Sequence, residues 1–338
     1  MLRNWKQICV GLAAVGIAGG AFAQDTRLTI IHGSPSGHPI TRAVETWMEC
    51  IQTTEGPQAD VSYYPGGQIS GIAELLQGLN NGVGHAAPIA AGYVSEKLPL
   101  NGVVMLPGLG STAQEVMDAY GAALESGPLR EEFLSNGVVP IWVMAWPPYQ
   151  IMSTSDPITS AEDFSGKVVR SAGGTMNLTI ESLGAAPAEI TIGDVYVAME
   201  RGTADATISS FSSIRSYGLA ELASSVSFNA SFGTFTNVFV IDQDKWTEFS
   251  PEMQDKAMAC GETTETAMAA FLDAETDELA AEFKEQGIDV YNLSDPQLDA
   301  FADAMTAVSN DWADRLEKRG LPARQVLEDY TSRFGGTE

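Results

Sequence analysis

Hydrophobic and polar residues follow two alternating rhythms along most of the chain. Short apolar or alternating runs, which predict strands, take turns with longer segments of helical spacing. In the first half, strands are predicted at 27–33, 59–64, 84–90 and 138–146. Helices are predicted at 41–54 and 71–82, and one or two helices at 112–137. Strands and helices in this order predict a mostly parallel sheet flanked by helices.

The same rhythm restarts after Pro147 and Pro148, which predicts a second α/β lobe. It predicts strands at 167–172, 188–192 and 204–210 and helices at 174–184 and 193–202. We therefore expect a first lobe at 24–145, a second lobe at 146–233, a return to the first lobe at 234–270, and a remainder at 271–338 that packs on the second lobe.

A third kind of pattern begins at Ser250. The order Ser250, Pro251, Glu252 is a strong helix start, and the segment that follows to residue 286 is rich in Ala, Glu, Met and Lys. A helix of this length spans about 50 Å, enough to brace two lobes. Two stacked helices broken near Gly261 are the alternative. A late strand at 288–294 and a closing helix at 295–320 are predicted next.

The first 23 residues have the layout of a secretory signal peptide. Arg3 and Lys6 precede an apolar stretch that ends in the small-x-small sequence at 21–23. An uncleaved membrane anchor is the alternative, although the apolar stretch is short for a span of about 20 residues. We expect a cleaved leader, a chain exported to the periplasm, and a mature part of roughly 315 residues, long enough for two lobes.

The charge and the cysteine content exclude several classes of partner and of binding site. The formal net charge is −26, and loss of Arg3 and Lys6 with the leader would make it −28, which disfavours nucleic acid and anionic lipid as partners. Cys50 and Cys260 would remain, either as one disulfide or as two buried thiols. The chain has no CxxC or HExxH motif and its three histidines are scattered, so neither a metal nor another cofactor is expected.

Two short stretches resemble active-site motifs without matching them. The stretch HGSPSGHP, which begins at His32, lacks a nucleophile elbow because Pro35 stands where G-x-S-x-G requires serine. We interpret it as a loop that follows the first strand and faces a cleft. The stretch SAGGTMN, which contains Gly173, lacks the lysine of a phosphate-binding loop, but it opens a helix and its N–H groups can face an anion.

Arg170 lies in GKVVRSAGG, at the end of an apolar strand in a very acidic chain. A planar guanidinium offers a fixed fork of donors that matches a carboxylate, and screening is weak in a cleft that excludes water. Arg170 is therefore the candidate anion-binding residue. A structural ion pair with one of the many acidic residues is the alternative.

Several collinear stretches resemble one family over nearly the whole mature chain. They include YYPGGQISGIAELLQGLNNG, DFSGKVVRSAGG and LGAAPAEITIGDVYVAMERGTAD. The order and spacing resemble the extracytoplasmic substrate-binding proteins of TRAP (tripartite ATP-independent periplasmic) transporters, the DctP family. The resemblance implies two α/β lobes joined by crossing strands and a long bracing helix, with a ligand held between them. It implies that Arg170 grips the carboxylate of the transported acid, and that membrane permease subunits are partners.

Departures from the family pattern shape the expected ligand. Gln150 stands where relatives that bind acidic sugars often carry a second arginine, His85 replaces the usual acid, and Ser209 replaces a common asparagine. A single guanidinium favours a ligand with one carboxylate. Besides Arg170, the candidate ligand-binding residues are His32, Trp146, Tyr149, Gln150, Gly173, Ser209, Phe211, Phe232 and Asn237.

The resulting prediction is a periplasmic binding protein that is not an enzyme and delivers a small organic acid to a TRAP permease. We expect a monomer rather than a homodimer. A binding protein of an ATP-driven importer or of a sensor is an alternative with the same lobes. A secreted hydrolase is a further alternative, but it would need a catalytic set that the sequence does not display.

Overall fold

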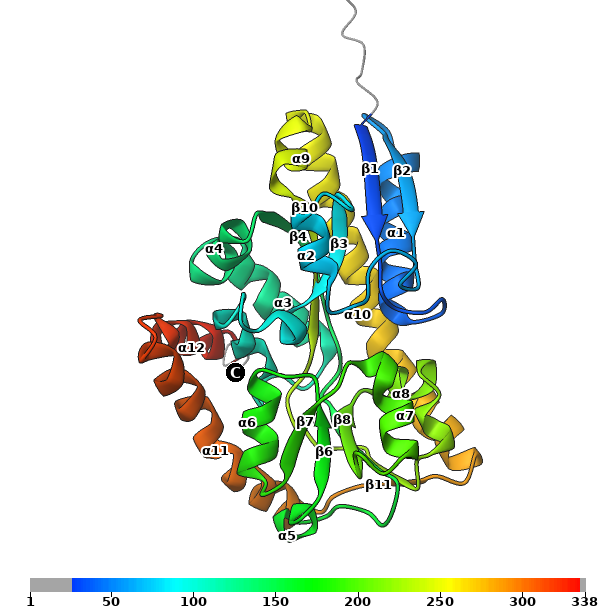
Figure 1. Ribbon diagram of the computed structural model, residues 1–338, viewed down its shortest axis with the longest axis vertical. Helices are drawn as coiled ribbons and strands as arrows, with labels where there is room; N and C mark the ends of the chain where they lie inside the picture. The colour runs from blue at the N-terminus through cyan, green and yellow to red at the C-terminus, as the bar shows by residue number, and fades with distance from the viewer. Residues whose placement is uncertain (1–25, 335–338) are drawn as a thin grey trace, which may run out of the picture.

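The computed structural model describes residues 26–334, which form two lobes joined by crossing segments (Figure 1). The leader predicted at 1–23 lies outside the described residues. Within the described part, none of the helices combines the length and the hydropathy that crossing a membrane requires. The two-lobed α/β architecture predicted from the sequence is confirmed.

The first lobe is built on a five-stranded mixed sheet in the order β2-β1-β3-β10-β4. Its strands are β1 (Thr26–Ile31), β2 (Ala59–Tyr64), β3 (Ala86–Ala90), β4 (Val138–Ala145) and β10 (Thr236–Asp242). Its helices are α1 (Pro39–Thr53), α2 (Leu75–Asn80), α3 (Ala113–Leu124), α4 (Pro128–Ser135) and α9 (Gln243–Glu248), with 3-10 turns η1 (Ala91–Val94) and η2 (Leu100–Met105). β10 returns from the second lobe and inserts antiparallel between β3 and β4, so the sheet is mixed where the pattern predicted mostly parallel strands.

The second lobe is built on a six-stranded sheet in the order β11-β9-β5-β8-β6-β7. Its strands are β5 (Gln150–Ser153), β6 (Val168–Ser171), β7 (Ala186–Glu189), β8 (Ala206–Ser209), β9 (Ser225–Ser227) and β11 (Asp289–Tyr291). Its helices are α5 (Ala161–Phe164), α6 (Thr175–Ser182), α7 (Val195–Glu200) and α8 (Phe211–Ser216). The parallel register of β6 and β7 pairs Val168 with Ala186, and the ladder ends before Ile190. β7 therefore ends earlier than the segment predicted at 188–192.

Two antiparallel crossing segments join the lobes. The Trp146 N–H donates to the Phe235 carbonyl over 3.0 Å, and the Tyr149 N–H donates to the Gly233 carbonyl over 2.8 Å. Gly233 has a φ of 99°, and a Cβ there would lie 2.4 Å from the Met105 carbonyl oxygen. Only glycine fits at this point, where the returning segment passes close to η2.

A single long helix, α10 (Pro251–Glu285), runs along both lobes as predicted. Its first part contacts α1, α3 and β4, and its last part contacts α8 and β11. Gly261 does not break it: a Cβ there would lie 3.0 Å from the Ile141 carbonyl oxygen, so glycine serves close packing of the helix on β4. The alternative of two stacked helices is therefore wrong.

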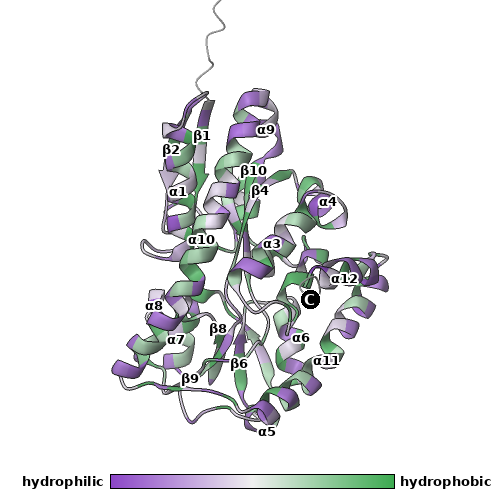
Figure 2. Cartoon of the chain, turned by 180° about the vertical axis from the view of Figure 1, so that it is seen from behind, coloured by the Kyte–Doolittle hydropathy of each residue, from purple (hydrophilic) through white to green (hydrophobic). Residues whose placement is uncertain are grey.

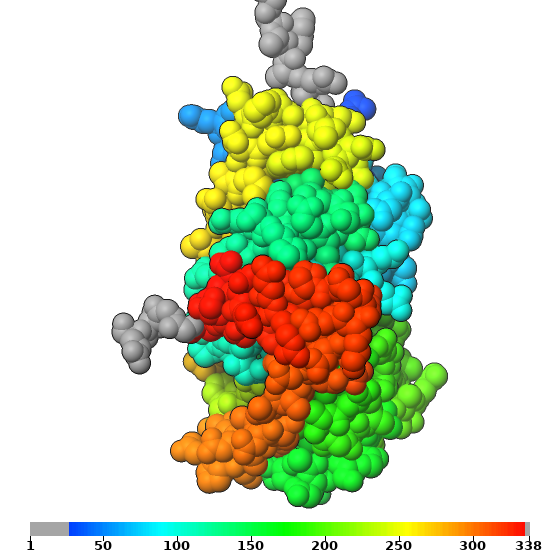
Figure 3. Space-filling view, turned by 90° about the vertical axis from the view of Figure 1, so that its left-hand side faces the viewer, coloured from blue at the N-terminus to red at the C-terminus, as the bar shows by residue number. Residues whose placement is uncertain are grey.

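The remaining C-terminal helices cover one side of the molecule, seen in orange and red in Figure 3. α11 (Asp295–Glu317) packs on α5 and α6 of the second lobe, whereas α12 (Ala323–Thr331) reaches α3 and η2 of the first. α12 was not predicted. The C-terminal part therefore touches both lobes.

Aromatic side chains fill the core of each lobe. In the first, the Phe239 ring lies between Trp47 and Trp142, with centroid distances of 4.7 and 4.9 Å. In the second, the Phe211 ring stacks on Phe283 of α10 at 5.4 Å. Hydrophilic residues mark outer helices such as α9 in Figure 2. The long helix is thus part of both cores.

Glu265 gives this framework a predicted pH dependence. Its carboxylate, half-buried on α10, accepts the N–H of Val143 on edge strand β4 over 2.6 Å. Burial raises the pKa of Glu265 to about 7, with a further increase from nearby Glu262 and Asp118. Between the ordinary pKa and this raised pKa, the folded state holds a proton that the unfolded state has lost. The contribution of Glu265 to stability is therefore complete below its ordinary pKa of 4.5 and is lost as the pH rises to about 7.

We expect Glu265→Gln to remove this fall, which amounts to at most about 3 kcal/mol of unfolding free energy. Urea unfolding measured between pH 5 and 8 tests it. Glu278→Gln, at an exposed position of the same helix, is the matched control and should keep the wild-type slope. Equal slopes for wild type and Glu265→Gln would contradict the assignment.

Candidate functional site

A small cavity lies between the lobes, walled by both of them and by the crossing segments. Its volume of about 20 Å³ holds about one water molecule. Its lining residues are Ser34, His38, Ile72, Tyr93 and Asn237 from the first lobe, Trp146, Tyr149 and Phe235 from the crossings, and Arg170, Ala172, Ile192, Ser213 and Tyr217 from the second lobe. An adjoining hollow of about 410 Å³ shares Tyr93 and Ala172 with it, so the cleft continues outward.

Arg170 stands at the end of β6 with its side chain buried in this cavity wall. Its Nε donates to the Ile190 carbonyl over 2.7 Å, and its Nη2 donates to the Tyr93 hydroxyl over 3.0 Å. None of the ion pairs within residues 26–334 involves Arg170. The structural ion pair considered as the alternative is therefore not found there. Within the described residues, Nη1 and the second Nη2 proton have no hydrogen-bond acceptor, and together they form a fork that can match a carboxylate.

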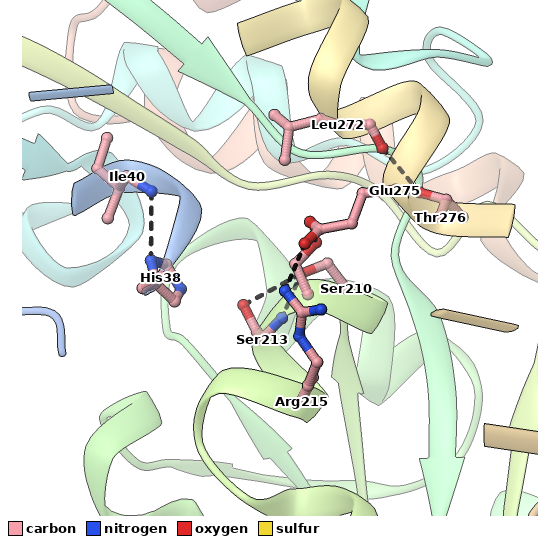
Figure 4. Close-up of polar contacts among 9 residues, drawn as sticks. His38, Ile40, Ser210, Ser213, Arg215, Leu272, Glu275 and Thr276 are labelled. Atoms are coloured by element: carbon pink, nitrogen blue, oxygen red, sulfur yellow. Dashed lines mark hydrogen bonds and ion pairs between the residues drawn. The ribbon is translucent and has the colours of Figure 1, made fainter. Parts of the chain in front are cut away.

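His38 supplies a neutral polar group. It is the N-cap of α1, where its Nδ1 accepts the Ile40 N–H over 3.4 Å (Figure 4), so in the neutral ring the proton sits on Nε2. Its ring packs edge-on against Trp146 and Tyr217, with centroid distances of 5.0 and 5.4 Å. Burial lowers the pKa of His38 to about 3, with a smaller contribution from His32. The imidazole therefore stays uncharged near neutral pH.

Aromatic side chains form the apolar walls. The rings of Tyr149 and Phe235 stack at 6.2 Å, and Tyr93 packs on Phe235 at 5.4 Å. Asn237 of β10 is buried beside them, and its side-chain amide makes no hydrogen bond to the described residues. The site thus combines one cation, neutral hydrogen-bonding groups and flat apolar surfaces.

One wall of the cavity is tied to the bracing helix (Figure 4). α8 carries Ser213 and is followed by its C-cap residue Tyr217, and both residues line the cavity. Arg215 of α8 pairs with Glu275 of α10 at 2.5 Å, and the Ser212 hydroxyl donates to the same carboxylate over 2.6 Å. Glu275 is only 5% exposed, so this contact holds α8 firmly against α10.

Of the predicted site residues, Trp146, Tyr149, Arg170 and Asn237 line the cavity. Gln150 does not. Its Nε2 donates to the carbonyls of Pro148 and Ala230, and its Oε1 accepts from the Ser227 hydroxyl and the Ala230 N–H. Its hydrogen-bonding groups are thus engaged by the protein itself, near the crossings.

The other predicted residues lie outside the cavity lining. Phe211 packs among Phe228 and Phe283, and Phe232 packs among Phe164 and Phe301. Ser209 is buried at the end of β8, and its hydroxyl has no partner in the described part of the chain. The Gly173 backbone, at a φ of 92°, passes near Gly92 and Glu189 of the outer hollow.

His32 is buried and does not line the cavity. Its Nδ1 accepts the Ser34 N–H over 3.1 Å, and its buried Nε2 has no partner among residues 26–334. Burial lowers the pKa of His32 to about 4, although the bond from Ser34 opposes the shift. Its ring faces Tyr63 edge-on at 6.3 Å.

Sequence reasoning missed Tyr93, His38 and Tyr217 as cavity residues. Tyr93 lies in η1 directly after β3, and His38 lies in the loop after β1. Ligands in open α/β sheets bind beyond the carboxyl ends of the strands, and this rule could have pointed to both residues. Within residues 26–334, potential metal-ligating side chains do not come together in groups of three or more.

Comparison with known proteins identifies the family. The model of the bacterial extracellular solute-binding proteins, family 7 (DctP), matches residues 30–315. A solute-binding protein of Albidiferax ferrireducens is 23% identical over 311 residues, covering 89% of this chain and 91% of its own.

Solved structures share the fold. A TRAP solute-binding protein from a marine metagenome, specific for aromatic acids and bound to 3-hydroxybenzoate, has a TM-score of 0.85 at 19% identity, covering 92% of this chain and 98% of its own. One from Rhodoferax ferrireducens bound to benzoate has a TM-score of 0.84 at 17% identity, covering 91% and 97%. The chain therefore belongs to the DctP family of extracellular solute-binding proteins, which are binding proteins and not enzymes.

Proposed function

We propose that this protein captures a small aromatic monocarboxylate between its lobes and delivers it to a TRAP permease. The observation that carries the proposal is the buried Arg170, which lines the cavity and makes no ion pair with a carboxylate of residues 26–334. A ligand carboxylate would form an ion pair with this guanidinium and accept two parallel hydrogen bonds from it. The mature protein is proposed to act as a monomer in the periplasm after loss of residues 1–23.

The cavity walls favour a flat apolar body behind the carboxylate. Trp146, Tyr149 and Phe235 supply aromatic surfaces, while His38 and Asn237 supply neutral polar groups. A second carboxylate would find no second guanidinium, because Arg170 is the one arginine in the lining. The structural neighbours that hold benzoate and 3-hydroxybenzoate support the same ligand class.

Ligand entry requires the lobes to separate, because the cavity is far smaller than the several hundred Å³ that organic ligands usually occupy. Bending of the crossing segments and of α10 would widen the cleft. Closure would then surround the ligand with groups from both lobes, as in other hinge-bending binding proteins.

A thermal-shift screen tests the ligand class. We expect benzoate and 3-hydroxybenzoate to stabilise the protein, by about 2.7 kcal/mol at 100 times the Kd. Benzamide, which has the same ring without the charge, should give no shift, and succinate should give a smaller one than benzoate. Equal stabilisation by benzamide, or a preference for the dicarboxylate, would contradict the proposal.

A further inference from the structure

Tyr93 makes a polar bridge between the lobes at the candidate anion site. It belongs to η1 of the first lobe, while both of its hydrogen-bond donors belong to the second. Its hydroxyl oxygen accepts Nη2–H of Arg170 over 3.0 Å and the backbone N–H of Ile192 over 3.0 Å. These bonds exist only while the lobes are together.

The hydroxyl keeps one proton to donate. A phenol oxygen that accepts two hydrogen bonds, one of them from a cation, has a polarised O–H group. Among the described residues, this O–H group has no hydrogen-bond acceptor. Tyr93 lines both the cavity and the outer hollow, and its hydroxyl contacts two residues of the cavity lining, Arg170 and Ile192. Packing of its ring on Phe235 fixes the side chain.

We propose that Tyr93 is the closing clamp of the site. Its hydroxyl oxygen holds the first lobe against Arg170 and Ile192, and its O–H donates a hydrogen bond to the bound carboxylate. Recognition of the anion and closure of the lobes are then coupled, because the ligand gains this donor only in the closed form. The inference rests on the carboxylate ligand proposed above and adds the residue that retains it.

Tyr93→Phe removes the hydroxyl and keeps the ring. We expect the Kd for benzoate to rise at least about 10-fold, equivalent to about 1.4 kcal/mol. The change should reside in koff, followed by stopped-flow tryptophan fluorescence, with kon altered less than about threefold. The Tm of the ligand-free protein should stay within about 2 °C of wild type, because only bonds between the lobes are lost.

Tyr63→Phe is the matched control. The Tyr63 hydroxyl is buried and has no partner among the described residues, so its loss should leave both Kd and koff unchanged. An unchanged Kd in Tyr93→Phe would overturn the clamp. A tighter Kd would overturn it too, because Tyr93 would then compete with the ligand for Arg170.

The outcomes separate this inference from the proposed function. If wild type does not bind benzoate but binds another carboxylate, the aromatic ligand class fails, and the clamp is judged by the same koff comparison with that acid. If no acid binds wild type, the proposed function fails and the clamp fails with it. If wild type binds and Tyr93→Phe behaves as wild type, only the clamp is wrong.

Discussion

Replacing Arg170 by alanine is expected to weaken binding of the carboxylate ligand by roughly 30-fold to several thousand-fold. The variant leaves a buried anion without its cation, and such a loss costs about 2–5 kcal/mol. The Arg170 side chain is only 2% exposed, so water cannot replace the guanidinium efficiently. Isothermal titration calorimetry with benzoate, or with the best acid of the screen, measures the effect.

Two further variants make the Arg170 result specific. Arg170→Lys keeps the charge but loses the fork and the bond to Ile190, so we expect it to remain well below wild type in affinity. Arg201→Ala removes an exposed arginine of the second lobe and should bind as wild type does. Binding by Arg170→Ala within about threefold of wild type would show that the anion lies elsewhere.

The strongly periodic elements could be predicted from the sequence. Helix α10 carries its own start signal at Ser250, whose hydroxyl accepts the Met253 N–H over 3.2 Å, and a long run of good helix formers follows. β4 is a continuous apolar run and is buried along its whole length. In such segments the local preference and the tertiary structure agree.

Short elements could not be predicted, because their stability comes from their partners. β9 has three residues, two of them serine, and it is a strand because β5 and β11 pair with it. α8 begins with FSS, which has weak helix propensity, and contacts to Glu275 of α10 fix its position. No local sequence pattern predicts such long-range contacts.

The candidate site divides in the same way. Arg170 could be found because an isolated guanidinium after an apolar strand is chemically unusual and because the surrounding stretch resembles a family motif. Gln150 begins β5 directly after one crossing segment, and Phe232 lies in the other. The alternation of side chains and local packing turn both side chains into the protein interior and away from the cavity. Tyr93 and Arg170 are 77 residues apart in the sequence and belong to different lobes. They meet only because the two lobes close on each other.

The disulfide between Cys50 of α1 and Cys260 of α10 leads to a second large expected effect. The two residues are 210 positions apart, so the bond closes a long loop in the unfolded chain. Cys50→Ser combined with Cys260→Ser is expected to lower the free energy of unfolding by about 2–5 kcal/mol. The Tm should fall by about 4–10 °C. Urea unfolding and calorimetry measure the two quantities.

The disulfide lies away from the cavity, so its removal should change the stability of the protein without changing ligand affinity. Both cysteines belong to elements that pack in the first lobe, and neither lines the cavity, so the Kd of the double variant should equal that of wild type where both are folded. A reducing agent should destabilise wild type by the same amount and leave the double variant unaffected, which controls for the two serines. If reduction does not shift the wild-type midpoint, the bond does not stabilise the fold. If the double variant binds more weakly, the bond also positions α10, and through Glu275 and α8 the wall of the cavity.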